Sequence, residues 1–196
     1  MTFKLEVDTS KPVPAVLPDF DDFFESAELV KFSDKINPLT ALDVVDAIDK
    51  ADRSQDICIS LNSVGGWLGW AIELADFIKL VQSEGITVRI VAERYCMSSA
   101  LAVLLSVPLE FRYCTSKTKF VIHSSRFSTE DGFIITDLSE DQISDIREAN
   151  ARQCQYLLSG SRIAKPSLLP VMDTYEDIVI RAKEALELGL VSAIID

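Results

Sequence analysis

Apolar residues along this chain fall into short continuous runs and longer runs with helical spacing, separated by polar turns. The continuous runs at 29–32, 56–61 and 86–92 are rich in β-branched residues, which is typical of buried strands. Between them, residues 38–51 and 67–83 carry apolar side chains at the spacing of one helical face. Strands joined by crossover helices predict a parallel sheet.

The first of these helices has a clear start signal. Asn37 can cap the helix and Pro38 suits its first position. We expect Leu39, Leu42 and Ile48 on its buried face, because they recur at helical spacing.

The second half of the chain continues the α/β pattern. We expect a buried helix at 100–107, a long polar-faced helix at 138–159, a short helical turn at 166–170 and a helix at 181–188. We expect strands at 110–114, 119–122 and 190–195, a hairpin at 124–136 and an extended segment at 173–180. The region 124–172 stands apart from the rest as one outlying strand-helix unit.

The first 25 residues do not follow this pattern, because they combine prolines with clustered acidic residues. We expect an extended arm over 1–25, either a solvated tail or an arm that reaches another subunit. A chain of 196 residues with 48% hydrophobic content otherwise supports one compact domain, over 26–196.

The formal net charge of −12 makes nucleic acid an improbable partner, because phosphate backbones require a basic surface. The same charge disfavours docking on an anionic membrane. We find no signal-peptide pattern and no apolar run near the roughly 20 residues that span a bilayer. These features predict a cytoplasmic protein.

Four cysteines, Cys58, Cys96, Cys114 and Cys154, show no metal-binding spacing, and the chain has one histidine. We therefore expect reduced, mostly buried thiols, no metal and no cofactor.

The candidate chemistry lies between residues 96 and 123. Ser98 and Ser99 begin the apolar helical run, and His123, the sole histidine, follows a strand. A Ser-His pair indicates nucleophilic catalysis, although a helix-capping serine and a structural histidine are the plainer interpretations. Gly65 and Gly66 directly follow a strand and allow a backbone N–H to approach a ligand.

Several motifs now resemble one family, the ClpP-type serine peptidases of the ClpP/crotonase superfamily. The resemblance extends over about 29–195 and rests on four motifs in family order, at 62–66 (Asn-Ser-Val-Gly-Gly), 97–100 (Met-Ser-Ser-Ala), 121–123 (Val-Ile-His) and 173–177 followed by Glu184-Ala185 and Gly189-Leu190. It implies the ClpP/crotonase-like fold of repeated strand-strand-helix units with a projecting handle, here at about 124–172.

The resemblance also implies a catalytic triad of Ser98, His123 and Asp177. Ser98 would attack the peptide carbonyl, His123 would act as general base and acid, and Asp177 would orient the imidazole. The backbone N–H groups of Gly66 and Ser99 would form the oxyanion hole. The order Ser, His, Asp excludes an α/β-hydrolase, in which the acid precedes the histidine.

Departures from the family pattern leave alternatives open. Arg94, Cys96 and Met97 replace smaller or different family residues beside Ser98, and Val64 replaces a proline. They indicate a divergent member of the family. The alternatives are a catalytically weak structural ring subunit, a crotonase-type acyl-CoA enzyme that needs no Ser-His pair, and a peptidase with Cys96 as nucleophile.

The resemblance finally implies partners. We expect peptides or unfolded proteins as substrates, homo-oligomeric rings stacked through the handle, and an AAA+ unfoldase as a possible feeder of substrate. The location would be the cytoplasm of a bacterial or phage-infected cell, or an organelle.

Overall fold

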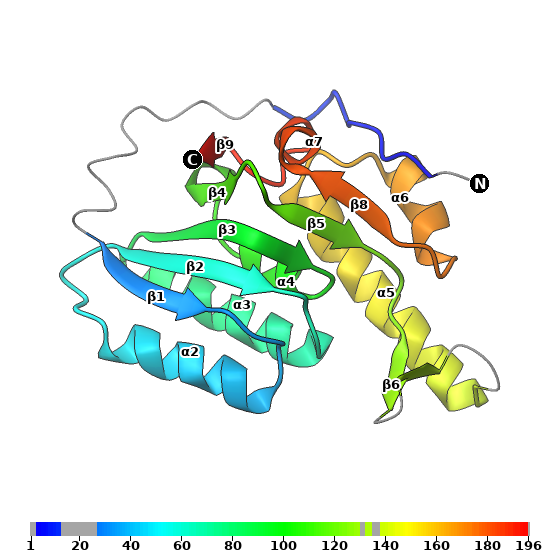
Figure 1. Cartoon of the computed structure of the whole chain (residues 1–196), viewed down its shortest axis with the longest axis horizontal. Helices are drawn as coiled ribbons and strands as arrows, with labels where there is room; N and C mark the ends of the chain where they lie inside the picture. Colours follow the sequence, from blue (N-terminus) through cyan, green and yellow to red (C-terminus); the bar gives the residue numbers. More distant parts are fainter. Residues whose placement is uncertain (1–2, 13–26, 130–131, 135–137, 196) are drawn as a thin grey trace.

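The computed structural model describes residues 3–12, 27–129, 132–134 and 138–195. It is a mixed α/β structure built on a seven-stranded sheet (Figure 1). The strands of this sheet are β1 (Glu28–Phe32), β2 (Ile57–Ser63), β3 (Val88–Met97), β4 (Arg112–Thr115), β5 (Lys119–Ile122), β8 (Ile178–Arg181) and β9 (Ala193–Ile195). The helices are α2 (Pro38–Lys50), α3 (Leu68–Ser83), α4 (Ala100–Leu104), η1 (Leu109–Phe111), α5 (Glu140–Gly160), α6 (Lys165–Met172) and α7 (Ala182–Glu187).

The sheet branches at β3. This strand pairs in parallel with β2 along one side. On its other side the first half pairs in parallel with β4, and the second half pairs in parallel with β5. β8 then pairs with β5 in the antiparallel direction. The sequence predicted a strand that ends at residue 92, but pairing with β5 carries β3 through the polar residues Glu93 and Arg94 to Met97.

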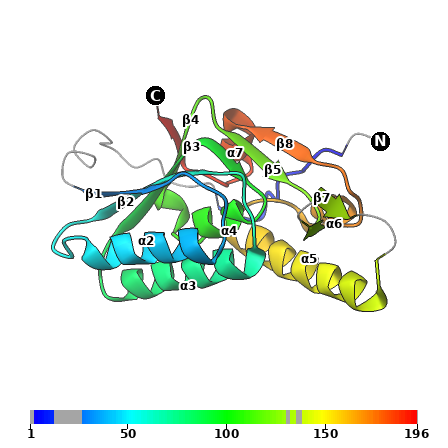
Figure 2. The ribbon, with the colours of Figure 1, turned by 60° about the horizontal axis from the view of Figure 1, so that its bottom comes forward.

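Helices α2, α3, α4 and α5 lie along one side of the sheet (Figure 2). The main core fills the space between these layers, and its fully buried side chains include Ile59, Ile78, Ile90 and Leu104. A smaller cluster of Cys58, Val91 and Tyr113 forms a second hydrophobic group.

Helix α2 begins as expected but buries a different face. Asn37 caps it through its side chain, with Pro38 at the first position. The buried residues are Ala41, Val44 and Ile48, whereas Leu39 and Leu42 are 74% and 52% exposed. The apolar positions of this helix are too numerous for one buried stripe, and the prediction for the two leucines was wrong.

The outlying unit contains a two-stranded hairpin, β6 (Phe127–Thr129) and β7 (Gly132–Ile134), followed by α5. Part of the hairpin turn lies outside the described residues. No residue of the first three turns of α5 is buried, and in Figure 1 this end of the helix projects from the sheet. Only Gln153, Cys154 and Leu157, nearer the other end, are buried.

The described part of the predicted arm, residues 3–12, packs against α6 and the segment before it. Val7 forms a β-bridge with Ile163, and the backbone N–H of Asp8 donates to the carbonyl of Arg162 over 2.6 Å. Leu5 is buried in the main core. This stretch is therefore not a solvated tail, while the rest of the predicted arm and its boundary with the domain at residue 26 lie outside the described residues.

Candidate active site

Three parallel strands bring the candidate residues to one edge of the sheet. β2, β3 and β5 are neighbours, so their carboxyl ends lie together. Gly65 and Gly66 follow β2, Ser98 follows β3, and His123 follows β5. The sequence placed His123 and the two glycines after strands and Ser98 at the start of a helix, and the order of the strands places all four side by side.

Ser98 occupies a strained turn between β3 and α4. Its φ of 54° is the one positive value among non-glycine residues in the described ranges. Its backbone N–H donates to the carbonyl of Val121 over 2.8 Å, which ties the turn to β5. A left-handed conformation costs energy for a residue with a Cβ, and such strain occurs preferentially at functional sites.

The glycine turn packs directly against Ser98. A Cβ on Gly65, whose φ is +87°, would lie 2.6 Å from the carbonyl oxygen of Met97 and 2.9 Å from Cβ of Ser98. Only glycine allows this approach. On its other side the turn pairs with Ile36, whose N–H donates to Gly65 and whose carbonyl accepts from Trp67, each over 2.9 Å.

The backbone N–H of Gly66 donates to the side-chain oxygen of Ser99 over 2.8 Å. The same hydroxyl donates in return to the carbonyl of Gly66, over 3.2 Å. Ser99 is buried and stands at the start of α4. The two residues singled out as oxyanion donors are therefore neighbours, and the hydroxyl of one occupies the N–H of the other.

His123 is half-buried, and its Nδ1 lies 2.6 Å from the carbonyl oxygen of Ser124. A carbonyl oxygen only accepts hydrogen bonds, so Nδ1 carries the proton in this contact. In the neutral ring Nε2 is then the unprotonated nitrogen, which is the form that a general base requires.

Asp177 lies immediately before β8. Antiparallel pairing matches Ile122 with Ile178, so the backbones of His123 and Asp177 continue the same register. The Asp177 carboxylate, half exposed, forms an ion pair with Arg126. Arg126 also donates to the carbonyl of Tyr175 over 2.9 Å. Within the described residues, no hydrogen bond joins the side chains of Ser98, His123 and Asp177.

A cavity of about 660 Å³ opens over this edge of the sheet. Ser98, Ser99, Gly66 and His123 all line it, and Asp177 does not. Its other lining residues are largely apolar or cationic, namely Lys35, Ile36, Asn37, Val64, Gly65, Trp67, Leu68, Ser125, Arg126, Phe127, Ala149 and Gln153. The cavity is large enough for several residues of an extended peptide.

Cys96 does not reach this cavity. The residue is fully buried, and burial raises the pKa of its thiol far above the ordinary range. A thiol that stays protonated and enclosed is a poor nucleophile. Within the described ranges, no group of three histidine, cysteine or acidic residues is arranged to hold a metal ion.

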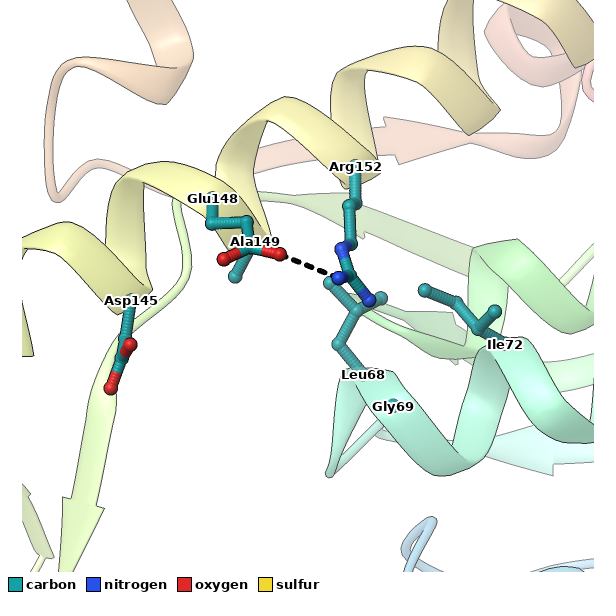
Figure 3. Close-up of a pocket in the computed structure, with 7 residues that line it drawn as sticks. All are labelled: Leu68, Gly69, Ile72, Asp145, Glu148, Ala149 and Arg152. Carbon is teal, nitrogen blue, oxygen red and sulfur yellow. Dashed lines mark hydrogen bonds and ion pairs between the residues drawn. The ribbon is translucent and has the colours of Figure 1, made fainter.

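A second, smaller cavity of about 230 Å³ lies between the start of α3 and the middle of α5 (Figure 3). Arg152 extends from α5 toward Leu68 and Ile72 of α3, and pairs with Glu148 one turn earlier over 2.5 Å. All side chains of this ion pair are more than half exposed. Its lining residues include no serine, threonine, cysteine or histidine.

Two contacts of the site had no signal in the sequence. Arg126 joins Asp177 across 51 residues, and the Ser99 hydroxyl joins Gly66 across 33 residues. The sequence marked Ser99 for its place at the start of a helix and, through the resemblance, for its backbone N–H, but it indicated no partner for the hydroxyl in the glycine turn.

Comparisons with known proteins agree with this fold. The Clp protease family model matches residues 23–196. The structure of ClpP1 from Listeria monocytogenes is 21% identical, with a TM-score of 0.64, and that of a ClpP1 mutant from the same organism is 22% identical, with a TM-score of 0.67. Each alignment covers 86% of this chain and 91% of the ClpP1 chain. No curated protein sequence matches the chain significantly.

The fold is therefore of the ClpP type, as predicted from the sequence motifs. The chain belongs to the Clp protease family. In the part of the chain that the structure describes, no helix has the length and apolar character needed to cross a membrane.

Proposed function

We propose that the chain is a serine endopeptidase whose nucleophile is Ser98. The observation that carries this proposal is the strained Ser98, which lines one cavity together with the sole histidine at adjacent strand ends. Ser98 attacks the peptide carbonyl while His123 Nε2 accepts its proton. The same nitrogen then protonates the leaving amine, and water hydrolyses the acyl-enzyme.

Asp177 completes the triad in this proposal. Its backbone register beside His123 and its place directly before β8 support the role. To reach His123 Nδ1, the carboxylate exchanges Arg126 for the imidazole, and Nδ1 exchanges the carbonyl of Ser124 for the carboxylate. The negative charge then stabilises the imidazolium that forms as Ser98 attacks.

The oxyanion would be bound by the backbone N–H groups of Gly66 and Ser99. Gly66 follows Gly65, whose backbone packs against Ser98. Ser99 directly follows the nucleophile at the start of α4. The backbone of the glycine turn is held by Ile36 and the backbone of Ser98 by Val121, so forming the hole requires movement of the Ser99 hydroxyl and not of the backbone.

We further propose that the enzyme works in the cytoplasm, inside a homo-oligomeric ring that receives unfolded polypeptides from an AAA+ unfoldase. Membership of the Clp protease family supports the ring and the peptide substrate. The projecting first half of α5, with no buried residue in the single chain, suits the contact between stacked rings.

A structural ring subunit with little activity is the second candidate. It is favoured by the ion pair that diverts Asp177 to Arg126 and by the hydroxyl that occupies the N–H of Gly66. The family match favours either candidate over an acyl-CoA enzyme.

Peptide hydrolysis distinguishes the two candidates. Purified protein is assayed with a library of short fluorogenic peptides, next to Ser98→Ala and His123→Gln. A peptidase cleaves at least one peptide class, and both variants lose this activity. A structural subunit cleaves none above the level of Ser98→Ala.

The assignment of Asp177 has its own test. Asp177→Asn is expected to lower kcat strongly, on the scale of the roughly 10⁴-fold loss known for the acid of another Ser-His-Asp triad. Asp173→Asn is the matched control, since Asp173 is an exposed carboxylate at the end of α6. An unchanged kcat in Asp177→Asn would show that the enzyme works with a Ser-His dyad and not with a triad.

A further inference from the structure

The hydroxyl of Ser99 occupies a position that the proposed reaction needs. Resting on the proposed function, we propose that this side chain gates the oxyanion hole. In the closed state it blocks the N–H of Gly66, and the hole opens only when the hydroxyl turns away. Ser99 thus has two functions in the same site, since its backbone N–H would bind the oxyanion while its side chain competes with it.

The geometry of the glycine turn makes this N–H available to Ser99. Gly65 and Trp67 direct their hydrogen-bonding groups toward Ile36, in a short parallel bridge. In an extended segment the groups of the intervening residue point the opposite way. The N–H and carbonyl of Gly66 therefore face Ser99, and both bind its hydroxyl, over 2.8 and 3.2 Å.

The contact joins a buried hydroxyl to an exposed residue. Ser99 is only 3% exposed, whereas Gly66 is exposed. The hydroxyl is therefore held in a buried position, while Gly66 remains accessible to a substrate. One lone pair of the hydroxyl accepts the N–H of Gly66, and its proton is donated to the carbonyl of Gly66, so both hydrogen bonds are made to one residue. An incoming oxyanion must replace this bond before it gains the charge-assisted bond that stabilises the transition state.

The expected size of the effect follows from the strength of such a bond. The net contribution of a protein hydrogen bond corresponds to a factor of roughly 2 to 13 in an equilibrium constant. Removing the hydroxyl should therefore raise kcat by about threefold to tenfold. KM should not change, because a ground-state carbonyl does not require the open hole.

Ser99→Ala tests the gate, with Ser99→Thr as the variant that keeps the hydroxyl. Ser106→Ala is the matched control, because Ser106 is also buried and its hydroxyl donates to the carbonyl of Val103 over 2.7 Å, just beyond α4. We expect Ser99→Ala to raise kcat and to tighten a peptide boronate, which forms a tetrahedral adduct, by the same factor. Ser106→Ala should resemble the parent protein, and Ser99→Thr, which keeps the hydroxyl, should show neither gain.

Amide hydrogen exchange gives a readout that does not depend on activity. In the parent protein the Gly66 amide should be protected by Ser99, and in Ser99→Ala it should exchange faster. The Trp67 amide, bound to Ile36, should keep its protection. Unchanged exchange at Gly66 would overturn the contact itself.

The remaining outcomes separate the gate from the proposed function. If the parent protein cleaves peptides and Ser99→Ala is equal or slower, the hydroxyl supports the turn and the gate is wrong. If exchange at Gly66 accelerates but neither protein cleaves peptides or binds the boronate, the contact is real, the peptidase proposal fails, and no gate on catalysis exists.

Discussion

Gly66 has no room for a side chain. A Cβ at this position would lie 2.1 Å from the carbonyl oxygen of Ile36, which is backbone and cannot move aside cheaply. The φ of +156° adds strain for any other residue. This geometry explains why a glycine must stand where the oxyanion would bind.

Gly66→Ala is therefore expected to distort the turn and to lower kcat by at least about 10²-fold, the scale of one lost oxyanion donor. Gly69→Ala is the control, because no atom lies within 4 Å of a Cβ at that position of α3. It should stabilise the protein by about 0.5–1 kcal/mol in urea unfolding and leave kcat unchanged. Equal effects of the two substitutions would contradict this account of the turn.

At the residue scale, the sequence predicted part of the site. The positions of His123 and the two glycines after strands followed from local pattern and from motifs, whereas Ser98 was expected only at the start of a helix. The positive φ of Ser98 and the partners of Ser99 and Asp177 depend on which strands become neighbours. Local pattern contains no information about these pairings, so these features could not be predicted.

At the scale of elements, strand pairing set boundaries that the local apolar pattern did not predict. Most strands and helices formed where apolar runs predicted them. β3 became longer because β5 pairs with its polar second half. The apolar run at 100–107 formed a helix only over Ala100–Leu104. The carbonyls at the ends of α4 and α5 share a donor, because Arg112 binds Leu105 after α4 and Gly160 at the end of α5.

Arg112 joins the ends of α4 and α5 from the start of β4. Its guanidinium is buried and donates to the carbonyls of Val107, Gly160 and Leu105 over 2.7, 2.5 and 3.4 Å. Burial lowers the pKa of this guanidinium to about 10, which leaves it charged at neutral pH. The charge is compensated by carbonyl oxygens at helix ends, where the helix dipole favours a cation.

Arg112→Leu should lower the free energy of unfolding by about 3 kcal/mol, because three carbonyls lose their donor in a buried site. Arg152→Gln is the control and should cost about 0.5 kcal/mol or less, because its pair with Glu148 is exposed. Urea unfolding of both variants measures the difference. A loss for Arg112→Leu no larger than that of the control would show that the buried guanidinium contributes little.

At the scale of the whole molecule, large apolar side chains remain on the surface of the single chain. They include Leu39, Leu42, Trp67, Leu80 and Val179, each more than half exposed. The first three turns of α5 have no buried residue. Surfaces of this kind are typical of subunits that bury them in an assembly.

We therefore predict a large homo-oligomer in solution. Light scattering at micromolar concentration should give the mass of stacked rings. Ile143→Asp, on the projecting half of α5, should reduce this mass by half by separating the rings, because it places a charge at a partly exposed apolar position. Arg147→Gln on the same half of the helix should have no such effect. A monomer mass for the parent protein would contradict the assembly.

The identity of the nucleophile is tested most directly by covalent labelling of the assembled protein. A fluorophosphonate probe should add one label per chain, and peptide mapping should place it on Ser98. Ser98→Ala and His123→Gln should both remain unlabelled, since the serine is activated by the histidine. Absence of label on the assembled parent protein, or a label that stays in Ser98→Ala, would contradict Ser98 as the nucleophile.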